Sequence, residues 1–172
     1  ASVWGAPTYV RTWRATANGL EAISVTLNDC LLILDEIGQS DPREIGATVY
    51  AVANGHGKQR AKRTGGAQEA ANWRTIVLSS GESTLSAHMQ ESGKKAKAGQ
   101  EVRLLSIPVT DRTHGVFDDL HGFDDGRAFA DYLKQSTSSF YGVAGPEFIK
   151  KLLDDKDCLP DLYARMCNRP EF

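Results

Sequence analysis

The most apolar run of the chain, residues 30–34, ends directly in an acidic pair, Asp35-Glu36. Because apolar and polar residues do not alternate in this run, it predicts a strand that is buried on both faces. In ATPases, such a strand end lets the first carboxylate hold the Mg²⁺ shell and the second polarise the attacking water. The alternative is a buried strand that ends in two solvated acids, and the pair alone leaves both interpretations open.

Small polar residues end the next strand-like run. Residues 73–79 predict a strand with residues 76–78 in the core, and its end carries Ser79 and Ser80. P-loop ATPases often use a small polar group, one strand over from the acids, to sense the γ-phosphate and hold the water. Serines that merely end a strand are an equal alternative.

A phosphate-binding loop would decide the question, and the sequence contains no G-x-x-x-x-G-K-[ST] motif. Gly57-Lys58 has Val52 in place of the first glycine and Gln59 in place of Ser or Thr. Gly93-Lys94 fails at the same two positions. As it stands, the chain is therefore expected to be inactive as an ATPase by itself.

Residues 55–66 form a basic segment without an acid, which the sequence predicts to be an exposed loop or hairpin. Its cations, which suit non-specific binding to DNA phosphates, are Lys58, Arg60, Lys62 and Arg63. No aromatic residue is interleaved with them, which weakens a base-stacking role. The alternative is a solvated loop whose charges only keep it soluble.

Composition restricts the remaining choices. The 172 residues, 41% of them apolar, suffice for one ordinary domain, and the formal net charge of −2 argues against a wholly basic nucleic-acid coat. Three cysteines without CxxC spacing argue against a disulfide framework and fit a reducing compartment, so a cytoplasmic location is expected. No apolar run approaches the length of a membrane span. The four histidines lie on different segments and indicate no metal site.

The remaining elements follow from periodicity and end signals. We expect a strand at residues 9–13, a capped helix from residue 18 and a helix that begins at Asp41 and ends at residues 54–55. A helix over residues 83–93 and a strand over residues 104–109, opened by Arg103, complete the α/β part.

The second part of the chain reads as helices. Asp124 or Asp125 caps one of them and Pro146 opens another. Their predicted buried stripes are Ala128, Phe129, Tyr132 and Leu133 in the first helix, and Phe148, Ile149, Leu152 and Leu153 in the second. We therefore divide the chain into a core at residues 1–110 and a helical extension at residues 111–172, a lid or an oligomer contact.

Several of these segments together resemble the family called domain of unknown function 927. The stretches that carry the resemblance, in order along most of residues 1–150, are residues 1–5, 12–21, 32–38, 53–55, 78–82 and 98–104. Members resemble superfamily III helicases and phage-type primase-helicases, within the P-loop ATPases. The implied fold is a parallel sheet flanked by helices, with a helical C-terminal tail. The implied ligands are ATP and Mg²⁺, and Ala1 would be an internal cut just after the phosphate loop.

The resemblance also implies residue roles. Asp35 would be the Mg²⁺-linked Walker B acid and Glu36 the base, while either Ser79 or Ser80 would be the sensor. Arg103 would be an arginine finger that reaches the nucleotide of a neighbouring subunit in a ring, and its other interpretation is an ordinary surface arginine. The basic segment would be the hairpin that tracks DNA, single-stranded or forked.

A different class of function also fits. The chain would then be a non-catalytic DNA-binding or assembly module of a mobile-element protein, or an ATPase remnant kept as a scaffold. For either class, a parallel sheet without its first strand would expose an edge and apolar faces. Self-association by strand pairing or swapping is therefore expected.

Overall fold

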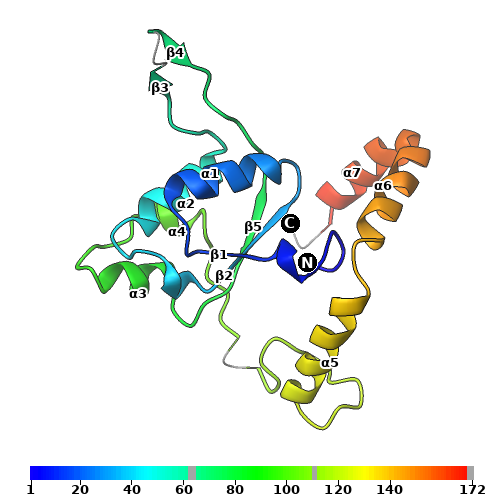
Figure 1. The fold of residues 1–172 in the computed structure, drawn as a ribbon. Helices are drawn as coiled ribbons and strands as arrows, with labels where there is room; N and C mark the ends of the chain where they lie inside the picture. The colour runs from blue at the N-terminus through cyan, green and yellow to red at the C-terminus, as the bar shows by residue number, and fades with distance from the viewer. Residues whose placement is uncertain (62–64, 110–111, 170–172) are drawn as a thin grey trace. The chain divides into compact units, whose positions relative to one another are not determined.

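The computed structural model describes residues 1–61, 65–109 and 112–169 (Figure 1). The chain forms two compact units, which are described separately. One is Val10–Asp119, and the other combines Ala1–Tyr9 with Leu120–Phe172. The predicted division into an ATPase core and a helical extension is a functional one, and it stays a prediction.

Three parallel strands form the sheet of the first unit. They are β1 (Arg11–Thr12), β2 (Leu31–Asp35) and β5 (Ile76–Ser79), in the order β1-β2-β5. Thr12 lies opposite Asp35 and Leu34 lies opposite Ser79, so the carboxyl ends of all three strands meet at one edge. Three of the predicted strands are thus present: β1 and β5 are shorter than expected and β2 is shifted by one residue. The predicted parallel α/β arrangement is confirmed.

Helices α1 (Ala17–Thr26) and α2 (Ile45–Asn54) follow the first two strands. Thr16 caps α1 by accepting the Gly19 N–H, as expected for a β-region N-cap. The α2 helix begins later than predicted, because Asp41 uses its carboxylate to accept the Arg43 N–H and closes a turn that precedes the helix. Its predicted end is confirmed by Gly55, whose φ of 71° suits glycine.

The hydrophobic core lies on one face of this sheet. Leu32 and Leu34 of β2 are fully buried there, and half-buried Val77 packs against the cluster from β5. The other buried members are Trp13, Leu20, Ile37, Ile45, Val49, Val52, Leu85 and Met89. The prediction that Ile76 and Leu78 belong to the core is wrong. They point to the opposite side of β5 from Val77 and are 76% and 56% exposed.

The predicted strand over residues 104–109 is wrong. A short helix, α4 (Ala98–Glu101), comes just before it, and Arg103 follows this helix in a turn rather than opening a strand. Leu105 and Ile107 are 73% and 77% exposed. A strand needs a neighbour for its backbone N–H and C=O groups, and in the described part of the chain β5 pairs with β2 alone. Helix α3 (Leu85–Gln90), capped by Thr84, matches the predicted helix at 83–93 with shorter bounds.

The basic segment was predicted to be a loop or a hairpin, and it is a β-hairpin. Strands β3 (Arg60–Ala61) and β4 (Ala67–Gln68) pair antiparallel, and Lys62 and Arg63 lie outside the described residues. Backbone bonds close its base, from Trp73 N–H to the Gly55 carbonyl at 3.0 Å and from Gly57 N–H to the Ala71 carbonyl at 2.8 Å. Figure 1 shows the hairpin extending away from the sheet and α1.

The second unit is helical, as predicted. Its helices are α5 (Gly126–Ser139), α6 (Ala144–Asp154) and α7 (Leu159–Cys167), with short 3₁₀ turns at Pro7–Tyr9 and Lys156–Cys158. Asp125, one of the two predicted caps, accepts the Ala128 N–H at 2.8 Å. Pro146 is not the first residue of α6, which begins two residues earlier.

The predicted buried stripes of these helices are largely wrong. Phe129 alone among them is buried, and the apolar side chains that remain exposed are Tyr132, Leu133, Phe148, Ile149 and Leu153. Tyr132 nevertheless lies against the Phe123 ring, with the two ring centroids 5.0 Å apart. In the described residues of both units, no helix combines the length and the apolar character needed to cross a membrane.

Candidate functional site

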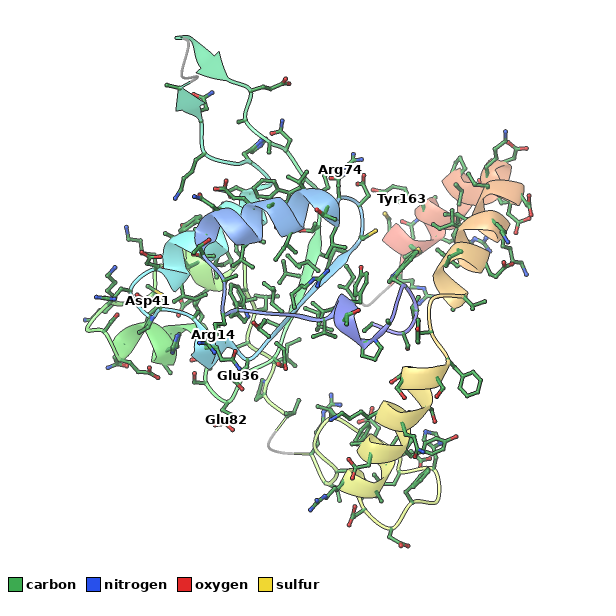
Figure 2. The ribbon with its side chains drawn as sticks, viewed as in Figure 1. Arg14, Glu36, Asp41, Arg74, Glu82 and Tyr163 are labelled. Atoms are coloured by element: carbon green, nitrogen blue, oxygen red, sulfur yellow. The ribbon has the colours of Figure 1, made fainter. Side chains whose placement is uncertain are left out.

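The predicted acids and serines lie together at the carboxyl edge of the sheet. The Ser80 hydroxyl donates a hydrogen bond to Oδ1 of Asp35, although the two residues are 45 positions apart in the sequence. The same hydroxyl oxygen accepts the backbone N–H of Glu36 at 3.1 Å. A single side chain therefore touches both residues of the acidic pair. Figure 2 shows Glu36 and Glu82 at the same end of the sheet, where β2 and β5 end.

Ser79 has a different partner. Its Oγ accepts the indole N–H of Trp13 at 2.9 Å, and its hydroxyl lies 3.3 Å from the carbonyl oxygen of Ser80. Trp13 is almost fully buried, and its backbone N–H donates to the Asp35 carbonyl at 3.2 Å. Ser79 therefore ties the end of β5 to the residue that follows β1.

Glu36 occupies an unusual backbone conformation. Its φ of 57° and ψ of 84° are left-handed, which is uncommon for a residue with a Cβ; Asp29 and His121 are the other described non-glycine residues with a positive φ. Its carboxylate turns back and accepts the Gly38 N–H through Oε1 at 3.0 Å. This bond fixes the direction of the Glu36 side chain at the start of a 3₁₀ turn, Ile37–Gln39.

Glycine allows the two strand ends to approach. The Ile37 N–H donates to the Ser80 carbonyl at 3.0 Å, and the Ser80 N–H donates to the Leu34 carbonyl at 3.2 Å. A Cβ on Gly81 would lie 2.5 Å from Cγ2 of Ile37, so any larger residue would push the strand ends apart. The glycine of the Ser79-Ser80-Gly81 sequence thus has a direct role in the geometry of the acidic edge.

The acidic edge carries a carboxylate of the kind that could face a magnesium ion. Asp35 is an exposed carboxylate, and carboxylate oxygens are ligands that Mg²⁺ accepts. No group of three or more His, Cys, Asp or Glu side chains gathers among the described residues, so at most two such side chains would face the ion. Mg²⁺ in nucleotide sites commonly takes one or two carboxylates and completes its shell with phosphates and water.

Arg103 is held by α2 and α4. Its Nε donates to Oδ1 of Asn54 at 3.1 Å, its Nη1 donates to the Gly99 carbonyl at 2.8 Å, and its guanidinium lies over the Tyr50 ring. The side chain is exposed on this surface. The structure therefore brings the acids and the serines together, and it fixes Arg103 through a separate set of partners.

Of the predicted DNA-binding cations, Lys58 is exposed near the hairpin base and Arg60 belongs to β3. The base is anchored from inside, because the buried Trp73 indole donates to the Val52 carbonyl at 2.9 Å. The hairpin leaves the sheet between α2 and the start of β5, whereas the acids lie where β2 and β5 end. These two features therefore lie at opposite ends of β5.

Trp13 is the site residue that sequence reasoning missed. Its interpretation as a packing residue is confirmed by its burial, but its indole also reaches Ser79. A hydrogen-bond donor at the last residue of the predicted strand, residues 9–13, was the signal that could have marked it, since the ends of parallel strands lie at the same edge as the acids.

Both the sequence and the fold are similar to known proteins. A family model matches the first part of the chain. Residues 1–72 match the domain of unknown function 927. This match confirms the predicted resemblance over residues 1–72, which include the acidic pair, Asp35-Glu36; the part of the resemblance beyond residue 72 lies outside it.

A solved structure described as "SCCmec type IV Cch - active helicase" shares the fold, with a TM-score of 0.58 over 91% of this chain. The two sequences are 24% identical, and this chain spans 25% of the length of that protein. No curated protein matches the sequence. This similarity shows the fold of the chain.

Proposed function

We propose that this chain is the acid-bearing part of a P-loop ATPase of helicase type, whose complete form couples ATP hydrolysis to movement on DNA. The observation that carries the proposal is the contact of Ser80 with Asp35 and Glu36 at the carboxyl edge of a parallel sheet. Ligands of open α/β sheets bind at that edge. The fold shared with a helicase-described structure and the family match over residues 1–72 support it.

Each residue of the edge has a role in this proposal. Mg²⁺ supplies charge neutralisation for the phosphates when it is bound. Asp35 accepts a hydrogen bond from its water shell, and Glu36 orients and polarises the attacking water. Glu36 can do so from a fixed position, because the Gly38 N–H holds one of its carboxylate oxygens.

The basic hairpin is the proposed DNA contact. Lys58, Arg60, Lys62 and Arg63 would bind backbone phosphates, a form of binding that weakens with salt and does not depend on base sequence. The hairpin is joined to β5, the strand that carries Ser79 and Ser80 at its other end. The strand β5 therefore connects the proposed DNA contact with the acidic edge.

Arg103 is proposed as an arginine finger that acts on the nucleotide of a neighbouring subunit. Its two bonds to Asn54 and Gly99 and its stacking on Tyr50 hold the guanidinium in place while its side chain stays exposed. Mixing an Arg103→Ala protein with a Glu36→Gln protein tests this role. Restored turnover in the mixture supports action between subunits, whereas a simple average of two inactive proteins contradicts it.

Glu36→Gln is the variant that tests the ATPase proposal, in a longer form of the protein that includes a G-x-x-x-x-G-K-[ST] loop. The amide oxygen of glutamine can still accept the Gly38 N–H, so the turn is kept while the carboxylate is lost. DNA-stimulated ATP turnover should fall by at least about 100-fold, the usual contribution of a general base.

Glu82→Gln is the matched control, because Glu82 is an exposed acid just past the end of β5. It should leave turnover within about twofold of the parent, well below the loss of a general base. Unchanged turnover in Glu36→Gln would remove the catalytic assignment. DNA binding without any ATPase activity in the parent would instead favour a DNA-binding or assembly module.

A further inference from the structure

Ser80 makes four hydrogen bonds to one short segment of the chain. Its backbone N–H donates to the Leu34 carbonyl, and its carbonyl accepts the Ile37 N–H. Its hydroxyl donates to the Asp35 carboxylate and accepts the Glu36 N–H. A hydroxyl has one donor and two acceptor positions, so it can make both of these contacts at once.

The neighbouring Ser79 cannot take this role in the observed geometry. It pairs with Leu34 in the sheet register and lies half-buried on the side of β5 that faces Trp13. Its hydroxyl is engaged by the Trp13 indole on one side and by the Ser80 carbonyl on the other. Because successive side chains of a strand point to opposite faces, one hydroxyl reaches the core and the next reaches the acids.

We infer that Ser80 is the positioning residue of the acidic pair and that Ser79 is an anchor for Trp13. The Ser80 hydroxyl fixes the orientation of the Asp35 carboxylate. The same oxygen satisfies the Glu36 N–H and so supports the left-handed backbone from which Glu36 presents its carboxylate. The catalytic meaning of this inference rests on the proposed ATPase function, whereas its structural content does not.

Two protons report separately on the two serines, and nuclear magnetic resonance can follow both in the ¹⁵N-labelled chain. The Glu36 amide donates its hydrogen bond to the Ser80 hydroxyl, and the Trp13 indole donates to the Ser79 hydroxyl. Ser80→Ala should accelerate hydrogen exchange of the Glu36 amide by at least about tenfold, because a protecting acceptor is lost, and leave the Trp13 indole unchanged. Ser79→Ala should do the reverse.

A buried strand amide provides the reference for global unfolding. The amide of Leu32 lies in the centre of β2, so an equal acceleration at Leu32, Glu36 and Trp13 would show lost stability instead of a local release. Ser80→Thr keeps the hydroxyl and should restore slow exchange at Glu36. If Ser80→Ala does not fold, Ser80→Cys, with its weak donor and acceptor, is measured in the same way. Unchanged exchange at Glu36 in the folded variant would overturn the inference.

Turnover in the longer protein provides the second measurement. Ser80→Ala should lower kcat by at least about tenfold with little change in KM, as expected when an interaction needed in the transition state is lost. Ser79→Ala should change kcat by less, and Ser80→Thr should recover most of it. If Glu36→Gln leaves turnover unchanged, the ATPase proposal fails while the exchange result stands; an exchange result of the wrong pattern rejects the role of Ser80 whatever the turnover.

Discussion

The guanidinium of Arg103 lies over the ring of Tyr50, with its central carbon 4.6 Å from the ring centroid. This contact joins α4 to α2, and it exists because Gly99 has no Cβ, which would overlap the Tyr50 hydroxyl. Gly46 of α2 likewise lets α4 approach closely, because a Cβ there would overlap the Gln100 side chain. The position of Arg103 therefore depends on two glycines as much as on its own hydrogen bonds.

Gly99→Ala should destabilise the chain by about 1–3 kcal/mol, because the added methyl group must displace the Tyr50 ring. Urea unfolding followed by tryptophan fluorescence measures the loss. Gly19→Ala is the control: in α1 a Cβ there meets nothing closer than 3.4 Å, and the change should stabilise by about 0.5–1 kcal/mol. Equal unfolding midpoints for the two variants would show that α4 does not need this close approach.

Neutralising the hairpin cations should weaken DNA binding and flatten its salt dependence. Each lost phosphate contact lowers the slope of log K against log salt by about 0.7 for single strands, so loss of four contacts lowers it by about 3. The quadruple variant changes Lys58, Arg60, Lys62 and Arg63 to Gln. Fluorescence anisotropy at several salt concentrations measures the slope.

A pairwise comparison separates the hairpin from general charge loss. Lys58→Gln with Arg60→Gln removes two hairpin charges, and Lys95→Gln with Lys97→Gln removes two charges from the exposed segment before α4. The hairpin pair should cost more affinity than the second pair. Equal losses would mean that the DNA contact is distributed over the surface, and no loss in either would exclude the hairpin as the contact.

The exposed side of β5 should drive self-association of this chain. Ile76 and Leu78 form an apolar surface on a strand whose second edge has no partner strand within the described residues. Unpaired strand edges pair readily with another chain, and inward-facing lysines block such pairing. Sedimentation should show concentration-dependent association that Ile76→Lys with Leu78→Lys reduces, while Val25→Lys on α1 leaves it unchanged. A clean monomer at high concentration would contradict the prediction.

Asp41 should titrate abnormally low. The hydrogen bonds from the Arg43 side chain and backbone lower the pKa of Asp41 to about 2. A pKa that is lower in the folded than in the unfolded chain stabilises the fold above the unfolded value, about 3.9, and this contribution is lost as the pH falls toward about 2. Because the pair is exposed, the effect on stability should be small and should weaken with salt.

Arg43→Gln tests the cause. Titration of the Asp41 carboxyl carbon should then move toward the ordinary range, since the side-chain hydrogen bond is the largest cause of the shift. The difference in unfolding midpoint between the two proteins should narrow when the pH is lowered from 5 to 2.5, because the Asp41 carboxyl is then mostly protonated in the unfolded chain and begins to be protonated in the folded one. If the pKa of Asp41 is the same in Arg43→Gln, the backbone N–H of residue 43 alone causes the shift.

Local signals predicted the elements that local interactions decide. The apolar run before Asp35, the glycine at the end of α2 and the glycine-flanked basic segment each produced the expected strand, helix end or hairpin. The predicted family resemblance is supported over residues 1–72.

The errors arose where distant residues decide the outcome. Leu104 to Val109 has the composition of a strand, but a strand forms only where its backbone pairs with a neighbouring strand, and within the described residues this segment pairs with none. The apolar residues of β5 predicted a buried strand, but Ile76 and Leu78 are exposed, because burial depends on which face of the sheet is covered. The choice between Ser79 and Ser80 depended on Trp13 and Asp35, neither of which is near either serine in sequence.

Glu36 places a bulky side chain at a φ of 57°, a conformation that glycine or asparagine adopts with less strain. A turn whose only task was to reverse the chain would therefore accept Gly or Asn more readily at this position. If position 36 were randomised and the variants ranked by folding alone, Glu should rank poorly; ranked by turnover of the longer protein, it should rank first. Glu36 is thus distinguished by a residue type that does not suit the left-handed backbone on which it stands.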